Sequence, residues 1–202
     1  DPNGAFTEQT VTVNVNNVAP NITSSATITF NEAIAANSIV HTATAIDPAG
    51  GTVTYALTGT DANLFTIDSA TGVVRIKDIP DYETKASYSF NIKASDPSGA
   101  FTEQTVTVNV TNVAPNITSS ATITFNEAIA ANSVVHTATA IDPAGGTVTY
   151  TLTGTDAAAF TINATTGVVT INAIPDFETK STYSFNIKAS DPSGAFTEQA
   201  VT

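Results

Sequence analysis

Apolar and polar residues alternate along most of the chain with a period of two. In the segment 88–94, the apolar residues at 88, 90, 92 and 94 are separated by serine, asparagine and lysine. Such alternation is typical of a β-strand that buries one face and exposes the other. The segments 53–57, 65–67 and 106–110 follow the same pattern. The chain is therefore expected to consist of short β-strands.

The alternating pattern recurs as a block of 95 residues. The blocks 1–95 and 96–190 differ at 15 positions, and a third copy begins at Asp191. A period of this length is that of a whole small domain rather than of a solenoid unit. Turn sequences such as Asp47-Pro-Ala-Gly-Gly divide each block into about seven short strands. We therefore predict an all-β fold of tandem seven-stranded, antiparallel Greek-key sandwiches of the immunoglobulin-like type.

The segment Asn-Val-Ala-Pro, at 17–20 and again at 112–115, is the expected link between domains. Proline fixes φ and cannot donate a hydrogen bond to a strand, so the link should be short and stiff. The predicted organisation is the final strand of a preceding repeat at 1–17, a domain at 18–112, and a domain at 113–202 that lacks its last residues.

The composition is that of an acidic globular protein, with 42% hydrophobic residues and a net charge of −12. This charge opposes binding to nucleic-acid phosphates or to an anionic membrane. Cysteine is absent, which excludes disulfides and thiolate metal sites. No apolar run approaches the length of roughly 18 residues that a membrane-spanning helix needs, so no membrane insertion is expected. The natural partner of this chain is a cation.

Catalytic chemistry finds no support in the residues. His41 and His136 occupy the same position in successive repeats, and their parity with apolar neighbours indicates packed side chains. No motif for a serine nucleophile, a zinc protease, a phosphate-binding loop or a dinucleotide occurs. We do not expect an enzyme.

The acidic residues gather at a few positions of each repeat. Asp81 and Glu83 lie two residues apart in an extended segment and so point to the same side, where their charges repel unless something positive lies between them. Asp47 and Asp96 each follow an alternating strand and should lie at strand ends. Lys85 is the nearest basic residue in sequence and offers one way to neutralise these acids, and a metal cation offers another.

These motifs resemble those of cadherin repeats, in the same order and over both repeats. The matching segments are Asn31-Glu32 for the family's Pro-Glu, Ala45-Ile-Asp47 for A-x-D-x-D, Asp81-Tyr-Glu83 for D-R-E, Ala94-Ser-Asp96 for A-x-D, and 109–115 for the linker D-x-N-D-N-A-P. The stretch 57–72 looks most like the cadherin-like repeats of large bacterial surface adhesins.

The resemblance implies calcium between consecutive domains. Its ligands at the complete junction would be Glu32, Asp81 and Glu83 of the first domain, Asn109, the Thr111 carbonyl and Asn112 of the linker, and Asp142 and Asp191 of the second domain. Asn14, Asn17, Asp47 and Asp96 would form half of a preceding junction, and Glu127, Asp176 and Glu178 half of a following one. Such oxygen ligands suit Ca²⁺, which takes about six to eight of them.

The sequence departs from the family pattern at four positions. Asn109 and Asn112 replace the linker aspartates, and Ala49 and Ala144 replace the second aspartate of A-x-D-x-D. Fewer charges weaken cation binding, so one or two ions are expected per junction, with dissociation constants of roughly 10⁻⁴ to 10⁻³ M. The alternative, in which the acids only solvate loop ends and pair with Lys85 or Lys180, stays open.

The predicted function is that of a structural stalk repeat of an extracellular bacterial adhesin, made rigid by interdomain calcium, that mediates cell adhesion and biofilm formation. Its partners would be calcium ions, neighbouring repeats and homophilic contacts at the cell surface. One alternative is a filament subunit in which the segment 5–15 adds a strand to a neighbouring molecule. Another is a glycan-binding or protein-binding module that uses exposed rings such as Phe101 and Phe177.

Overall fold

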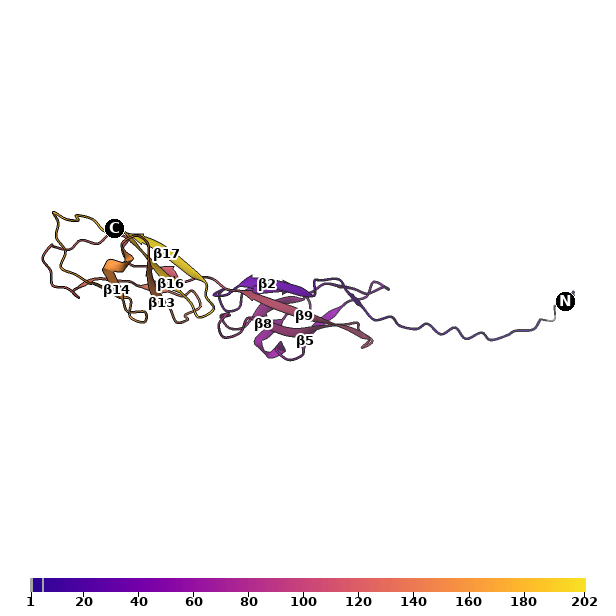
Figure 1. The fold of residues 1–202 in the computed structure, drawn as a ribbon. Helices are drawn as coiled ribbons and strands as arrows, with labels where there is room; N and C mark the ends of the chain where they lie inside the picture. The colour runs from indigo at the N-terminus through magenta and orange to yellow at the C-terminus, as the bar shows by residue number, and fades with distance from the viewer. Residues whose placement is uncertain (1, 5) are drawn as a thin grey trace.

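The computed structural model describes residues 2–4 and 6–202 and contains two β-sandwiches placed end to end behind an extended arm (Figure 1). We refer to residues 18–112 and 113–202 as the first and second repeat, and to residues 6–17 as the arm. The arm runs away from the first repeat, and its valines Val11, Val13 and Val15 are 74%, 79% and 92% exposed. Position 5 of the predicted leading strand 5–15 lies outside the described residues.

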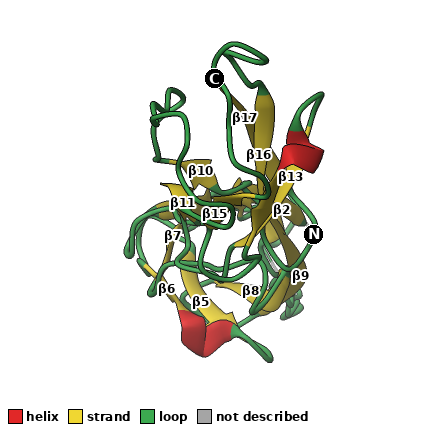
Figure 2. Cartoon of the chain, turned by 60° about the vertical axis from the view of Figure 1, so that its left-hand side comes forward, coloured by secondary structure: helices red, strands yellow, loops and turns green. Residues whose placement is uncertain are grey.

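The first repeat contains strands β1 (Asn21–Ile22), β2 (Thr27–Asn31), β3 (Ile39–Thr42), β4 (Ala45–Ile46), β5 (Thr54–Thr58), β6 (Phe65–Ile67), β7 (Val73–Ile76), β8 (Ser87–Ser95) and β9 (Phe101–Thr111). The second contains β10 (Asn116–Ile117), β11 (Val134–Thr137), β12 (Ala140–Ile141), β13 (Thr149–Thr153), β14 (Phe160–Ile162), β15 (Val168–Ile171), β16 (Phe185–Ser190) and β17 (Phe196–Val201). Short 3₁₀ turns at Ala62–Leu64 and Ala157–Ala159, drawn red in Figure 2, precede β6 and β14.

Each repeat is a sandwich of two main sheets, as the alternating pattern predicts. In the first repeat, one sheet has the order β2-β9-β8-β5 and the other β3-β7-β6, while β1 and β4 form a short separate pair. The second repeat has sheets β13-β16-β17 and β11-β15-β14 and the pair β10-β12, and among its described residues no strand corresponds to β2. The all-β fold class predicted from the sequence is thus confirmed.

One pairing differs from the antiparallel sandwich expected from the sequence, because β2 and β9 run parallel. The first and last strands of an odd-numbered sandwich run in the same direction when the chain enters at one end and leaves at the other. This arrangement places the linker at the far end of the first repeat from the arm, so that successive repeats continue in a line (Figure 1).

The core lies between the sheets and is formed by the inward residues of the alternating strands. Phe90 and Ile92 of β8 are 1% and 0% exposed, and the Phe65 ring lies 4.8 Å from that of Phe90, measured between centroids. Phe160 and Phe185 reproduce this pair in the second repeat at 4.7 Å. Each repeat therefore has a core of its own, which is the condition for a chain of separate domains.

Candidate functional site

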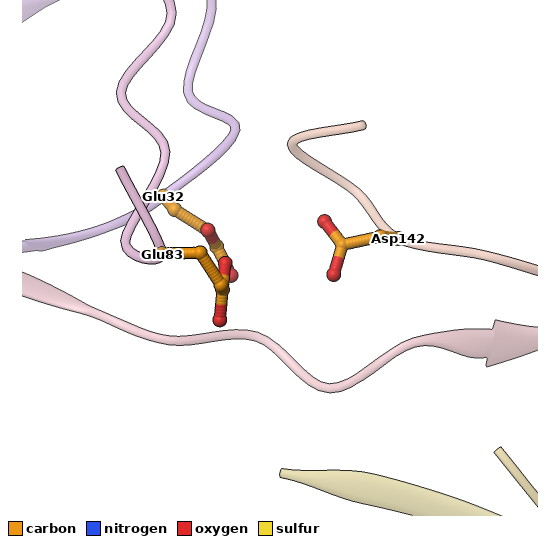
Figure 3. A group of neighbouring side chains, drawn as sticks. All are labelled: Glu32, Glu83 and Asp142. Carbon is orange, nitrogen blue, oxygen red and sulfur yellow. The ribbon is translucent and has the colours of Figure 1, made fainter. Parts of the chain in front are cut away.

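Three carboxylates from distant parts of the chain meet between the two repeats (Figure 3). Glu32 directly follows β2, Glu83 lies in the turn before β8, and Asp142 follows β12 of the second repeat. One oxygen from each lies within 4.8 Å of the others. In Figure 3 the two glutamates approach from the first repeat and the aspartate faces them from the second. We refer to these residues, together with Asp191 and the linker 109–115, as the junction.

Glu32 holds the linker and the turn of its own repeat in place. Its side chain is 2% exposed, Oε1 accepts a hydrogen bond from the Val113 amide at 2.7 Å, and Oε2 accepts one from the Tyr82 amide at 2.9 Å. Its own amide donates to the carbonyl of Thr111 at 3.0 Å. Glu32 is thus fixed by the backbone on both sides, which leaves its carboxylate at a defined position in the junction.

Glu83 has no such partners. Both of its carboxylate oxygens are buried, and neither has a hydrogen-bond partner within the described part of the chain. Burial raises the pKa of Glu83, and the nearby negative charges of Glu32, Asp191 and Asp142 raise it further. A buried carboxylate beside other acids needs a proton or a cation to neutralise it.

Asp142 and Asp191 bring the second repeat into the junction. Asp142 is 3% exposed, and its Oδ1 accepts a hydrogen bond from the Ala144 amide, whereas its buried Oδ2 has no partner among residues 2–4 and 6–202. Asp191 is 4% exposed. Burial acts to raise the pKa of Asp191, but the hydrogen bonds from Ser193 and Asn112 outweigh it, so that this pKa lies below its ordinary value. Asp191 therefore stays ionised beside Glu83.

Two of the predicted ligands lie outside the group of three carboxylates. Asp81 accepts hydrogen bonds from the amide and the hydroxyl of Thr84, and the hydroxyl contact is the largest reason why the pKa of Asp81 lies below its ordinary value. Asn109 is exposed on β9. The carbonyl of Thr111 lies in the junction but already accepts the Glu32 amide.

The half-junction before the first repeat has the same contact between the linker asparagine and an aspartate as the complete junction, but it has no acid cluster among the described residues. Asn17 Nδ2 donates to Asp96 Oδ2 at 2.6 Å, and this bond is the largest cause of the lowered pKa of Asp96. Asp47 is 9% exposed and accepts the Ala49 amide, whereas Asn14 is exposed in the arm.

The half-junction at the far end of the second repeat has the acids without a facing repeat. Glu127, Asp176 and Glu178 offer oxygens within 4.8 Å of one another, but all three residues are exposed. Glu178 and Glu83 therefore occupy equivalent turns in different surroundings.

The lysines do not neutralise the junction, contrary to the alternative in which they pair with these acids. Lys85 forms an ion pair with Asp61 at 2.9 Å, and Lys180 forms one with Asp156 at 2.6 Å. Sequence reasoning missed Asp61, which is 8% exposed and also accepts the Ser89 amide. Its position opposite Lys85 depends on the packing of the 3₁₀ turn against β8, for which the sequence carries no local signal.

The cadherin domain family matches residues 26–111 and 121–202, one match for each sandwich. The chain belongs to the cadherin domain family. It is 31% identical over 177 residues to human Protocadherin Fat 4, which covers 80% of the chain, and 32% identical over 154 residues to human Cadherin-23, which covers 70%. The chain spans 4% and 5% of the length of these two cadherins.

Solved cadherin structures share this arrangement. The crystal structure of human Protocadherin-24 EC1-2 superposes with a TM-score of 0.51 at 26% identity, covering 92% of this chain and 94% of that one. Other cadherins that are similar to the chain come from mouse, rat and fruit fly. These animal relatives give no support to the bacterial setting expected from the sequence. No helix in the described part of the chain has the length and apolar character needed to span a membrane.

Proposed function

We propose that this chain is part of the extracellular stalk of a cell-adhesion protein, and that calcium bound at the junction makes the stalk rigid. Cadherin repeats belong to cell-adhesion proteins rather than enzymes, which supports the general role. The observation that carries the proposal is that Glu32 and Glu83 of the first repeat meet Asp142 of the second. Buried oxygens of Glu83 and Asp142 lack hydrogen-bond partners among the described residues.

The donor set fits calcium. All of the groups are oxygens, as a hard cation prefers, and Glu32 keeps additional lone pairs after its two backbone contacts. The buried Asn112 Oδ1, which has no partner among residues 2–4 and 6–202, adds a neutral oxygen from the linker. Calcium bound here would supply the positive charge that the ion pairs of Lys85 and Lys180 leave missing.

The chain would become rigid because ligands on the two repeats share one ion. Without a cation, the carboxylates of Glu83 and Asp142 repel across the junction, which favours separation of the repeats. With a cation, the same groups are attracted to one centre and the repeats are held in line. The repeats keep their separate cores in both states, so calcium changes the shape of the chain rather than its fold.

Small-angle X-ray scattering tests this proposal through the maximum dimension and the spread of shapes. We expect calcium to narrow the distribution of maximum dimensions for the natural sequence. The variants Glu83→Ala and Asp142→Ala should abolish this narrowing. The matched control is Glu178→Ala, which alters the equivalent turn of the second repeat, where no other repeat faces it. Asp156 is a poor control because it holds Lys180 and the Ser184 amide. A Glu83→Ala chain that still stiffens with calcium would refute the shared site.

A further inference from the structure

The linker asparagine of the junction makes direct contacts with the second repeat. Asn112 Nδ2 donates to Asp191 Oδ2 at 3.0 Å and also to the hydroxyl of Ser193. Asn17, the equivalent residue ahead of the first repeat, donates to Asp96 Oδ2 at 2.6 Å and to Ser98 Oγ at 2.7 Å. The same contact thus occurs at both linkers.

The chemistry of these contacts requires an amide. Asp191 Oδ2 accepts a hydrogen bond here, so a donor has to face it, and an aspartate at position 112 would place a second carboxylate against it. The amide orientation follows from this, because turning the side chain over would place Asn112 Oδ1 against the carboxylate. With Nδ2 engaged, Oδ1 is left buried and without a partner among the described residues.

Val113, the residue after Asn112, attaches the linker to the first repeat. The Val113 amide donates to Glu32 Oε1 at 2.7 Å, so consecutive linker residues contact opposite repeats through hydrogen bonds that involve a charged partner. Such bonds are stronger than those between neutral groups. None of these contacts needs a cation.

We infer that Asn112 is a clasp that docks the linker on the second repeat without a cation. The docking does not depend on the proposed function, whereas the part left to calcium does. The replacement of the linker aspartate therefore exchanges part of the calcium dependence of the junction for a permanent hydrogen-bonded attachment. Calcium is left to fix Glu83 against Asp142.

Distance measurements between the repeats in a chelator test the clasp directly. Because the chain has no cysteine, spin labels can be placed on cysteines introduced at the exposed positions Ala70 and Ala158. In the chelator we expect the distance distribution to be broader for Asn112→Asp than for the natural linker, with about a tenfold rise in the undocked population, the effect of losing a hydrogen bond to a charged group. Ser193→Ala should have a smaller effect in the same direction.

The control is Asn109→Asp, which adds the same charge three residues earlier on the exposed face of β9. An Asn109→Asp effect equal to that of Asn112→Asp would show that added charge, rather than the lost donor, loosens the linker. An unchanged distribution for Asn112→Asp in chelator would overturn the clasp. Failure of calcium to narrow any of the distributions would instead refute the proposed function and leave the clasp standing.

Discussion

Replacing Glu83 by Gln should have opposite effects on stability with and without calcium. Glu83 carries its charge within a group whose oxygens lie within 4.8 Å of one another. At that separation two unit charges repel by about 3.5 kcal/mol at an effective dielectric constant of 20, and by about 0.9 kcal/mol in water. Glutamine keeps the size of the side chain and removes the charge. We therefore expect Glu83→Gln to stabilise the first repeat by at least about 1 kcal/mol in a chelator.

Differential scanning calorimetry measures this effect. A stabilisation of 1 kcal/mol raises the melting temperature of a repeat of this size by roughly 4 to 8 °C. In calcium the natural sequence should melt at the higher temperature. Calcium binding stabilises it by about 2.7 kcal/mol at a hundredfold excess over Kd, and the variant loses most of that binding. Glu178→Gln, on the exposed equivalent turn, should shift neither midpoint. A lower midpoint for Glu83→Gln in chelator, or an undiminished calcium response, would refute the reasoning.

The pH dependence of the metal-free chain gives the same argument an independent check. The pKa of Glu83 is raised above its ordinary value of 4.5, so the folded state binds this proton more tightly than the unfolded state does. Its contribution to stability is complete below pH 4.5 and is lost as the pH rises through the folded-state pKa. The metal-free natural sequence should accordingly become more stable as the pH falls from 7 toward 4.5, and Glu83→Gln should lack this gain.

Further predictions concern parts of the fold outside the junction. Gly72→Ala should unfold the first repeat at markedly lower denaturant concentration, by several kcal/mol, since Gly72 has a φ of +71° and an added Cβ would lie 2.3 Å from the Ala43 carbonyl oxygen. Gly99→Ala, at a φ of +93° with nothing within 4 Å, should cost only about 1 to 2 kcal/mol. Asp61→Ala should lower the stability of the first repeat by about 1 to 3 kcal/mol through loss of the Lys85 and Ser89 contacts, with the calcium shift unchanged.

The strands and their repetition could be predicted because both are local properties of the sequence. A period of two fixes which side of a strand is buried, as at Phe90 and Ile92, and the 95-residue repeat fixes the order of the domains. The parallel pairing of β2 with β9 was missed, since alternation is the same in parallel and antiparallel strands. The direction of pairing depends on where the chain enters and leaves each sandwich.

The sequence by itself determined which donor groups the junction offers, because its motif positions are occupied by carboxylates and amides, whose donors to a cation are oxygens. Only the tertiary structure decided which of these groups can act together. Glu83 and Glu178 follow Tyr82 and Phe177 in otherwise closely similar segments, yet in this chain Glu83 lies against Asp142 of another repeat and Glu178 is exposed. Burial and charge at these positions are set by segments far apart in the chain, which no local pattern encodes.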